Sequence, residues 1–176
     1  MLHWPGTPAR FQVCLPDAAA PACWVALTAG AQPALAATWR LLDIDAGQPA
    51  IYAPTLEAFV PQMVNLELIG GVSFKKGCYP GQEIVARMHY LGKPSRRMYR
   101  LQTTASQTSA GAAVLDANDR EVGTVVDAQP ASTGDCRLLA VLQAAAADVP
   151  LHLVDGAQLE RLAMPYALDS AATADH

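Results

Sequence analysis

The sequence has few aromatic residues and few charges for its length. Of its 176 residues, 6% are aromatic and 16% are charged, whereas 52% are hydrophobic. Much of the hydrophobic share is alanine, with 34 residues, and alanine buries little area per residue. This much apolar material still supports one ordinary domain or two small ones, so wholesale disorder is excluded. The net charge of −4 disfavours a generally basic nucleic-acid binder.

Cysteine is scarce and widely spaced. The chain has four cysteines, Cys14, Cys23, Cys78 and Cys136, and no C-x-x-C pair. This spacing disfavours a zinc or iron–sulfur site made by this chain alone, so no metal ligands are expected. It also disfavours a disulfide framework in a chain of this length, so reduced thiols are expected.

Long hydrophobic runs are absent as well. No run approaches the ~18 apolar residues that cross a bilayer, which predicts no membrane association. Residues Met1 to Ala9 lack a cationic opening followed by an apolar run, which predicts no secretory signal. Together with reduced thiols, these absences predict a cytoplasmic protein.

The charge that is present is unevenly distributed. Seven cations and one acid, Glu83, lie between residues 75 and 100, which gives this segment +6 and the rest of the chain −10. The seven cations of this basic stripe are Lys75, Lys76, Arg87, Lys93, Arg96, Arg97 and Arg100. Such a stripe indicates an anionic ligand or partner, and a solvated edge is the alternative.

The hydrophobic pattern changes near Pro94. Before Pro94, alternation, helical spacing and proline positions predict strands and helices. The strands are 10–15, 23–27 and 72–74, and the helices are 34–42, 55–60 and 82–90. After Pro94, alternation between polar turns predicts six short strands that fit a small antiparallel barrel. They are 97–103, 112–115, 121–128, 137–142, 151–154 and 158–163.

The stretch VSFKKGCYPGQEIVARMHYLGKPSRRMYR, residues 72–100, carries the strongest chemical signal. Gly77 and Gly81 bracket Cys78, which places its thiol on a tight turn just before the predicted helix. The positive end of the helix macrodipole and the two preceding lysines favour the reactive thiolate. The pattern therefore predicts a reactive thiol at Cys78, and a small buried cysteine is the alternative.

The acidic and histidine residues of the predicted helix are open to two interpretations. Glu83 in the first turn suits the macrodipole and can accept a proton or a hydrogen bond from a ligand. With Arg87 one turn further along, it can equally form a plain surface ion pair. His89 has no cysteine or second histidine at ligand spacing, so a packed or solvated side chain is expected.

KGCYPGQE, continued by IVAR, resembles the K-G-C-[FY]-x-G-Q-E-x-x-[AS]-R signature of the YgfZ-type folate-binding proteins, relatives of the glycine cleavage T-protein. Five other segments, 47–49, 61–66, 72–74, 122–125 and 164–166, are similar to the same family. The resemblance runs from about Trp39 to Leu168. It is specific, because a cysteine in this turn distinguishes the family from ordinary T-proteins.

The resemblance implies an α+β fold, in which the remainder of a ferredoxin-like α/β layer precedes a small antiparallel β-barrel. The expected domains are 1–94 with the motif, 95–168 as the barrel and 169–176 as a flexible tail. Family members carry a large part before the matched region, so the chain is expected to be a C-terminal portion or a shortened member. An incomplete folate pocket and self-association through exposed apolar surface are then expected.

The resemblance further implies tetrahydrofolate or a one-carbon derivative as the ligand. It implies Cys78 as the reactive thiol and a folate-binding set of Lys76, Gly77, Tyr79, Gly81, Gln82, Glu83 and Arg87. The implied role is maintenance of iron–sulfur enzymes, including the one that methylthiolates tRNA. The folate glutamate tail is one anion that would match the basic stripe.

Three functions stay open on the sequence. The favoured one is a folate-binding accessory factor for iron–sulfur protein assembly or repair, with client or assembly proteins as partners. The second is a tetrahydrofolate-dependent aminomethyltransferase. The third is a tRNA- or protein-binding module that uses the basic stripe without a small ligand.

Overall fold

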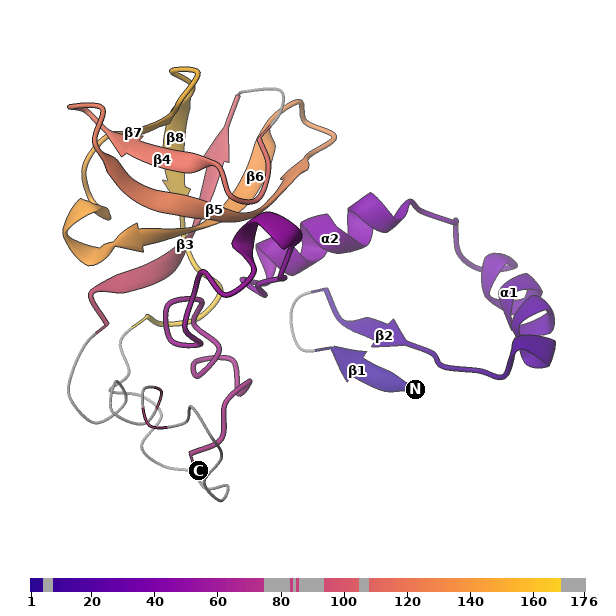
Figure 1. Cartoon of the computed structure of the whole chain (residues 1–176). Helices are drawn as coiled ribbons and strands as arrows, with labels where there is room; N and C mark the ends of the chain where they lie inside the picture. Colours follow the sequence, from indigo (N-terminus) through magenta and orange to yellow (C-terminus); the bar gives the residue numbers. More distant parts are fainter. Residues whose placement is uncertain (5–7, 75–82, 84, 86–93, 105–107, 169–176) are drawn as a thin grey trace. The chain divides into compact units, whose positions relative to one another are not determined.

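The structure is a computed structural model that describes residues 1–4, 8–74, 83, 85, 94–104 and 108–168. The chain divides into two compact units, Met1–Arg40 and Leu41–His176 (Figure 1). Among the described residues, no helix combines the length and the apolar character needed to cross a membrane. The predicted boundary at residue 94 stays a prediction.

The first unit contains a two-stranded antiparallel sheet followed by helical segments. Strand β1 (Leu2–Trp4) pairs with β2 (Arg10–Gln12), which is shorter than the predicted strand 10–15. The short 3₁₀ helix η1 (Asp17–Ala19) leads into α1 (Ala20–Thr28). The Trp4 ring meets Trp39 edge-on at 6.2 Å, and the Arg10 guanidinium lies 4.9 Å from the Trp39 ring centroid. Aromatic and cation–π contacts therefore hold the two-stranded sheet against Trp39, near the C-terminal end of this unit.

The predicted strand 23–27 is wrong, because this segment lies inside α1. Its run of apolar residues has neither a two-residue nor a helical period, so periodicity cannot separate a strand from a helix. A proline in the first turn and the neighbouring alanines favour the helix. Helix α1 has no buried residue, and Trp24 is 59% exposed, so the tryptophan is not a core residue.

Helix α2 (Ala36–Asp45) confirms the predicted helix 34–42 and extends it by one turn. The predicted helix 55–60 is wrong: the chain forms only the 3₁₀ turn η2 (Ala53–Thr55). Glu57 then adopts a left-handed conformation at φ 58°, which ends helical geometry.

The predicted strand 72–74 is also wrong, because these residues pair with no strand among the described residues. Of the predicted helix 82–90, Glu83 and Val85 are described, and both are helical.

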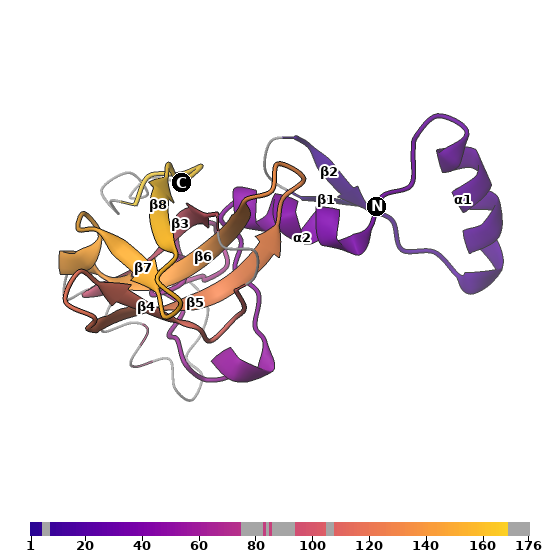
Figure 2. The ribbon, with the colours of Figure 1, turned by 90° about the horizontal axis from the view of Figure 1, so that it is seen from above.

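All six strands predicted after Pro94 are confirmed. They are β3 (Arg96–Thr103), β4 (Ala113–Asp116), β5 (Glu121–Pro130), β6 (Cys136–Gln143), β7 (Leu151–Leu153) and β8 (Gln158–Leu162). The 3₁₀ turn η3 (Ala144–Ala146) follows β6. The strands close a barrel in the order β3-β6-β5-β4-β7-β8, and β8 pairs back onto β3 (Figure 2). The α+β class with a small antiparallel barrel is therefore confirmed.

Strands β3, β5 and β6 are buried on both faces. One cluster, which includes Tyr99, Leu101, Leu138 and Leu142, takes residues from every strand and fills the barrel. Alternate residues of β3, β5 and β6, among them Met98, Val126, Leu139 and Val141, form a second cluster on the outer face. Ile44 of α2 and the segment 59–66 cover this outer face. The segment that precedes the motif is therefore packed directly on the barrel.

Candidate functional site

Most of the predicted site lies outside the described residues. Cys78 is among the undescribed residues, and so are Lys76, Gly77, Tyr79, Gly81, Gln82 and Arg87. Glu83 is described as exposed and Val85 as buried, each in a helical conformation. The roles assigned to the motif stay predictions. The structure instead shows which residues contact the motif at Val85.

Gln62 connects the segment before the motif to the motif helix. Its Nε2 donates a 2.6 Å hydrogen bond to the carbonyl oxygen of Val85. The residue is 2% exposed, and its Oε1 has no hydrogen-bond partner within the part of the chain that the structure describes. A buried amide that is only half paired costs free energy in folding. An apolar side chain of the same length would avoid this cost. The benefit of an amide at residue 62 therefore lies in its hydrogen bond to Val85.

Arg97 of β3 is the charged centre of the same cluster. Its Nη1 donates to the carbonyl oxygen of Gln62 at 3.0 Å and to Oδ1 of Asn65 at 3.4 Å. The same nitrogen forms an ion pair with Glu67, and each of these two side chains is 9% exposed. Loss of either partner would leave the other charge buried and unpaired. The segment 61–67 is therefore held on the barrel by charge as well as by apolar packing.

Asn65 and Tyr166 extend the cluster to the segment after β8. The Nδ2 of Asn65, which is fully buried, donates to the carbonyl oxygen of Met98 at 2.8 Å and lies 3.4 Å from the Tyr166 hydroxyl. That hydroxyl donates to the carbonyl oxygen of Gly47 at 2.8 Å. Burial raises the pKa of Tyr166. Gly47 has φ 64°, and an added Cβ would lie 2.7 Å from the Tyr166 ring, so glycine is needed there.

Part of the basic stripe is neutralised inside the fold. Arg97 pairs with Glu67, as above, and Arg100 Nη1 donates to the carbonyl oxygen of Asp45 at 2.8 Å and lies 3.7 Å from its carboxylate. Arg137 of β6 contacts the other oxygen of the same carboxylate at 2.6 Å, and Asp45 raises the pKa of Arg137. Arg96 is exposed. The stripe is therefore not a uniform solvent-facing surface, because two of its arginines serve internal packing.

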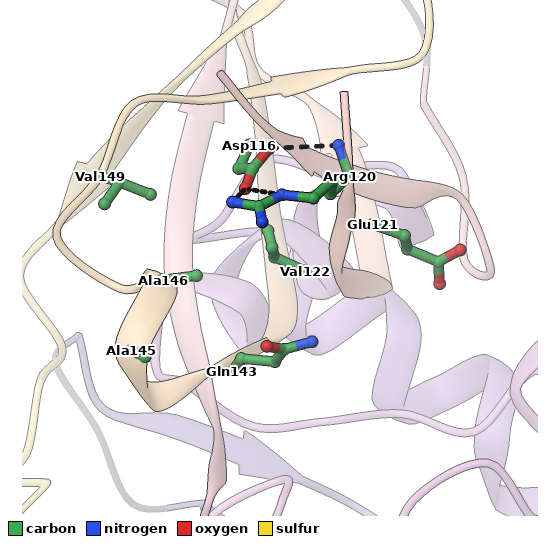
Figure 3. Close-up of a pocket in the computed structure, with 8 residues that line it drawn as sticks. All are labelled: Asp116, Arg120, Glu121, Val122, Gln143, Ala145, Ala146 and Val149. Atoms are coloured by element: carbon green, nitrogen blue, oxygen red, sulfur yellow. Dashed lines mark hydrogen bonds and ion pairs between the residues drawn. The ribbon is translucent and has the colours of Figure 1, made fainter. Parts of the chain in front are cut away.

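The described part of the second unit contains cavities, two of which have similar volumes. An apolar cavity of about 310 Å³ is lined by the segment 49–66 and by Val126 of β5. A second cavity of about 320 Å³ lies between the turn after β4 and η3 (Figure 3). There Arg120 pairs with Asp116 at 2.9 Å. Hydrogen bonds from the backbone of Asn118 and from Arg120 lower the pKa of Asp116. No described lining residue of either cavity belongs to the predicted site.

The described residues contain no group of three or more His, Cys, Asp or Glu that could hold a metal ion. The described cysteines are dispersed. Cys14 is exposed after β2 rather than within a strand as predicted, Cys23 is half-buried in α1, and Cys136 is buried in β6. Burial raises the pKa of Cys136, which suits the structural role predicted for it.

The sequence places Arg97 in the basic stripe, but it does not predict the buried cluster that Arg97 forms with Gln62, Asn65, Glu67 and Tyr166. One signal was present, because two amides stand within the otherwise apolar stretch PQMVNL, residues 61–66. Amides in an apolar stretch indicate buried hydrogen bonds, since such groups are costly when unpaired. Their partners lie 23 to 101 residues away in the chain, and no local pattern shows them.

No protein-family model matches the chain. A tRNA-modifying protein YgfZ of Edwardsiella ictaluri is 38% identical over 175 residues, which cover 96% of this chain and 53% of that protein. The YgfZ protein of Cronobacter sakazakii is 40% identical over 144 residues, 79% of this chain and 43% of its own length. The chain is a relative of the YgfZ proteins. The YgfZ protein of Colwellia psychrerythraea is 42% identical over 108 residues, 59% of this chain and 33% of its own length.

The resemblance to YgfZ proteins, stated above from the motif, is therefore confirmed. The chain spans about half the length of the Edwardsiella YgfZ protein that it matches. Among solved structures, the aminomethyltransferase of the glycine cleavage system from Bartonella henselae is 19% identical, with a TM-score of 0.41. That likeness covers 50% of this chain and 26% of the other.

Proposed function

We propose that this chain takes part in tRNA modification in the manner of the YgfZ proteins. The observation that carries the proposal is the 38% identity to a protein named tRNA-modifying over 96% of this chain. The KGCYPGQE motif adds a chemical reason, because its sequence predicts a glycine-bracketed turn before a helix, and a thiol at such a position favours the thiolate. The role is that of a cytoplasmic accessory factor rather than of the modifying enzyme itself.

The finer proposal concerns the ligand and the client. Tetrahydrofolate or a one-carbon derivative binds at the motif through Lys76, Gly77, Tyr79, Gly81, Gln82, Glu83 and Arg87, and Cys78 supplies the thiol. The clients are iron–sulfur proteins, including the enzyme that methylthiolates tRNA. The exposed position of Glu83 supports this proposal, because a carboxylate that binds a ligand needs an accessible surface.

A chimaera tests the function. This chain replaces the matching region of the Edwardsiella YgfZ protein, and the chimaera is expressed in a bacterial strain that lacks its own YgfZ protein. Methylthiolated nucleosides in tRNA are then measured by mass spectrometry. We expect the chimaera to restore them and Cys78→Ala to reduce the restored level by at least about tenfold, since thiol chemistry has no substitute in alanine.

Cys14→Ala is the matched control, because Cys14 is exposed and lies outside the motif. It should restore modification as fully as the unaltered chimaera does. Full restoration by Cys78→Ala would overturn the thiol role, and failure of the unaltered, folded chimaera would overturn the proposed function.

Folate binding has its own test. Equilibrium dialysis with tetrahydrofolate should show binding to the chimaera that Glu83→Gln weakens by about tenfold, the loss expected for one charge-assisted hydrogen bond. Equal binding by both would remove Glu83 from the site. Formation of methylenetetrahydrofolate from an aminomethylated donor would instead identify an aminomethyltransferase.

A further inference from the structure

The motif helix is contacted by a residue that the proposed function does not use. We propose that Gln62 is a positioning residue for the motif, which holds the helical backbone at Val85 in place from the buried side. The proposal rests on the proposed function of the motif, but its test does not depend on folate or on a client protein.

The contact itself has the features of a specific anchor. The 2.6 Å bond from Nε2 ends on a backbone carbonyl, so its position is independent of the side chain at 85. Gln62 is 2% exposed and Val85 is 7% exposed, so water does not compete for this bond. Among the described residues, Oε1 of Gln62 has no hydrogen-bond partner, so these residues offer no second reason for an amide at this position.

Gln62 is itself fixed, which a positioning residue requires. Its backbone carbonyl accepts a 3.0 Å bond from Arg97 on β3, and Asn65 of the same segment donates to the carbonyl of Met98 on that strand. Arg97 is held in turn by its ion pair with Glu67. Strand β3 therefore holds the segment that contains Gln62 and Asn65, and Gln62 in turn holds the backbone at Val85. Val85 lies seven residues after Cys78.

Gln62→Met tests the proposal. Methionine has a similar length, so it fills the space, removes the Nε2 donor and removes the unpaired oxygen at once. We expect amide hydrogen exchange in peptides that contain Val85 to be about tenfold faster in the variant, the change that corresponds to one buried hydrogen bond. Peptides from β5 and β6 should exchange at unchanged rates.

Tyr52→Phe is the matched control. The Tyr52 hydroxyl donates a 2.9 Å bond to Asp127, so the variant also removes one part-buried hydrogen bond from the same unit. It should leave exchange at Val85 unchanged. A second measurement is alkylation of Cys78 by iodoacetamide, resolved by peptide mass spectrometry, whose rate should change in Gln62→Met and not in Tyr52→Phe.

The outcomes separate the two proposals. The positioning role is overturned if hydrogen exchange at Val85 is unchanged in Gln62→Met. It is also overturned if Val85 already exchanges fully in the unaltered chain. Both results count even if Cys78→Ala abolishes tRNA modification. Faster exchange at Val85 supports the positioning role even if the chimaera fails to restore tRNA modification.

Discussion

Arg97 shows how one side chain can serve a role that its position in the sequence conceals. It lies in the basic stripe, yet its guanidinium points into the fold and meets Glu67, Asn65 and the carbonyl of Gln62. Its neighbour Arg96 is exposed. Two adjacent arginines of the stripe therefore lie in opposite environments, one paired inside the fold and one at the surface.

Arg97→Met should therefore destabilise the protein strongly. The variant leaves the Glu67 carboxylate buried without its cation, which costs about 3–5 kcal/mol of unfolding free energy. Urea unfolding followed by circular dichroism measures the change. Arg120→Met is the control, because the Arg120 side chain is 73% exposed and an ion pair with an exposed partner contributes little to stability. Equal effects of the two variants would contradict the buried role of Arg97.

Tyr166 makes the stability of the protein depend on pH in the alkaline range. Burial raises the pKa of its hydroxyl above the ordinary value of about 10. Below that ordinary value, the hydroxyl keeps its proton in both the folded and the unfolded state, and the contribution of Tyr166 to stability is fully present. Between it and the higher pKa of the folded state, only the unfolded chain loses the proton, so stability falls as pH rises.

The expected result is a steeper fall of unfolding free energy above about pH 10 in the unaltered protein than in Tyr166→Phe. Urea titrations between about pH 8 and pH 11 measure it. The variant should also lose about 1 kcal/mol at neutral pH, because it gives up the bond to Gly47. Parallel pH profiles would show that Tyr166 titrates no differently in the two states.

At the scale of elements, the close approach of β5 and β6 depends on a glycine. Gly123 lies opposite Leu142 in the strand pair. A Cβ added at Gly123 would lie 2.5 Å from the carbonyl oxygen of Val141 and 2.5 Å from a Leu142 methyl carbon. A backbone oxygen cannot move aside as the end of a side chain can, so the strands would have to separate.

Gly123→Ala should destabilise the barrel by about 1–3 kcal/mol, the usual cost of overpacking. Gly30→Ala is the control, because an added Cβ there meets no atom within 4 Å. Thermal unfolding should show a lower midpoint for Gly123→Ala and little change for Gly30→Ala. A barrel that tolerates alanine at residue 123 would mean that the two strands can separate at little cost.

At the scale of the whole molecule, apolar side chains gather on the surface of the first unit. On α1, Trp24, Val25 and Leu27 are 59%, 68% and 55% exposed. Exposed apolar surface of this kind favours association, because burying it removes it from water. This is the surface that carries the proposed self-association.

Self-association should therefore depend on α1. In sedimentation velocity over a range of concentrations, the double variant Val25→Lys, Leu27→Glu should shift the protein toward the monomer. Val154→Lys is the control, because Val154 is 74% exposed and lies in the second unit, outside α1. A monomer at all concentrations in the unaltered protein would reject the proposal.

How well the structure could be predicted depends on how far apart in the sequence the interacting residues lie. The six barrel strands were predictable, because alternation and polar turns are local features of the sequence. The strand 23–27 was not, because an apolar run without a period fits a helix equally well and no partner strand could be foreseen. The bond from Gln62 to Val85 joins residues 23 apart, and the Arg97–Glu67 pair joins residues 30 apart.

The sequence by itself determined the α+β class, the barrel strands and the relation to the YgfZ proteins, since each depends on local pattern or on a contiguous motif. Tertiary structure decided which arginines of the basic stripe face inward and which side chain contacts the motif helix. The reason is physical: burial and charge pairing depend on which distant segments meet, and that is settled only when the barrel closes.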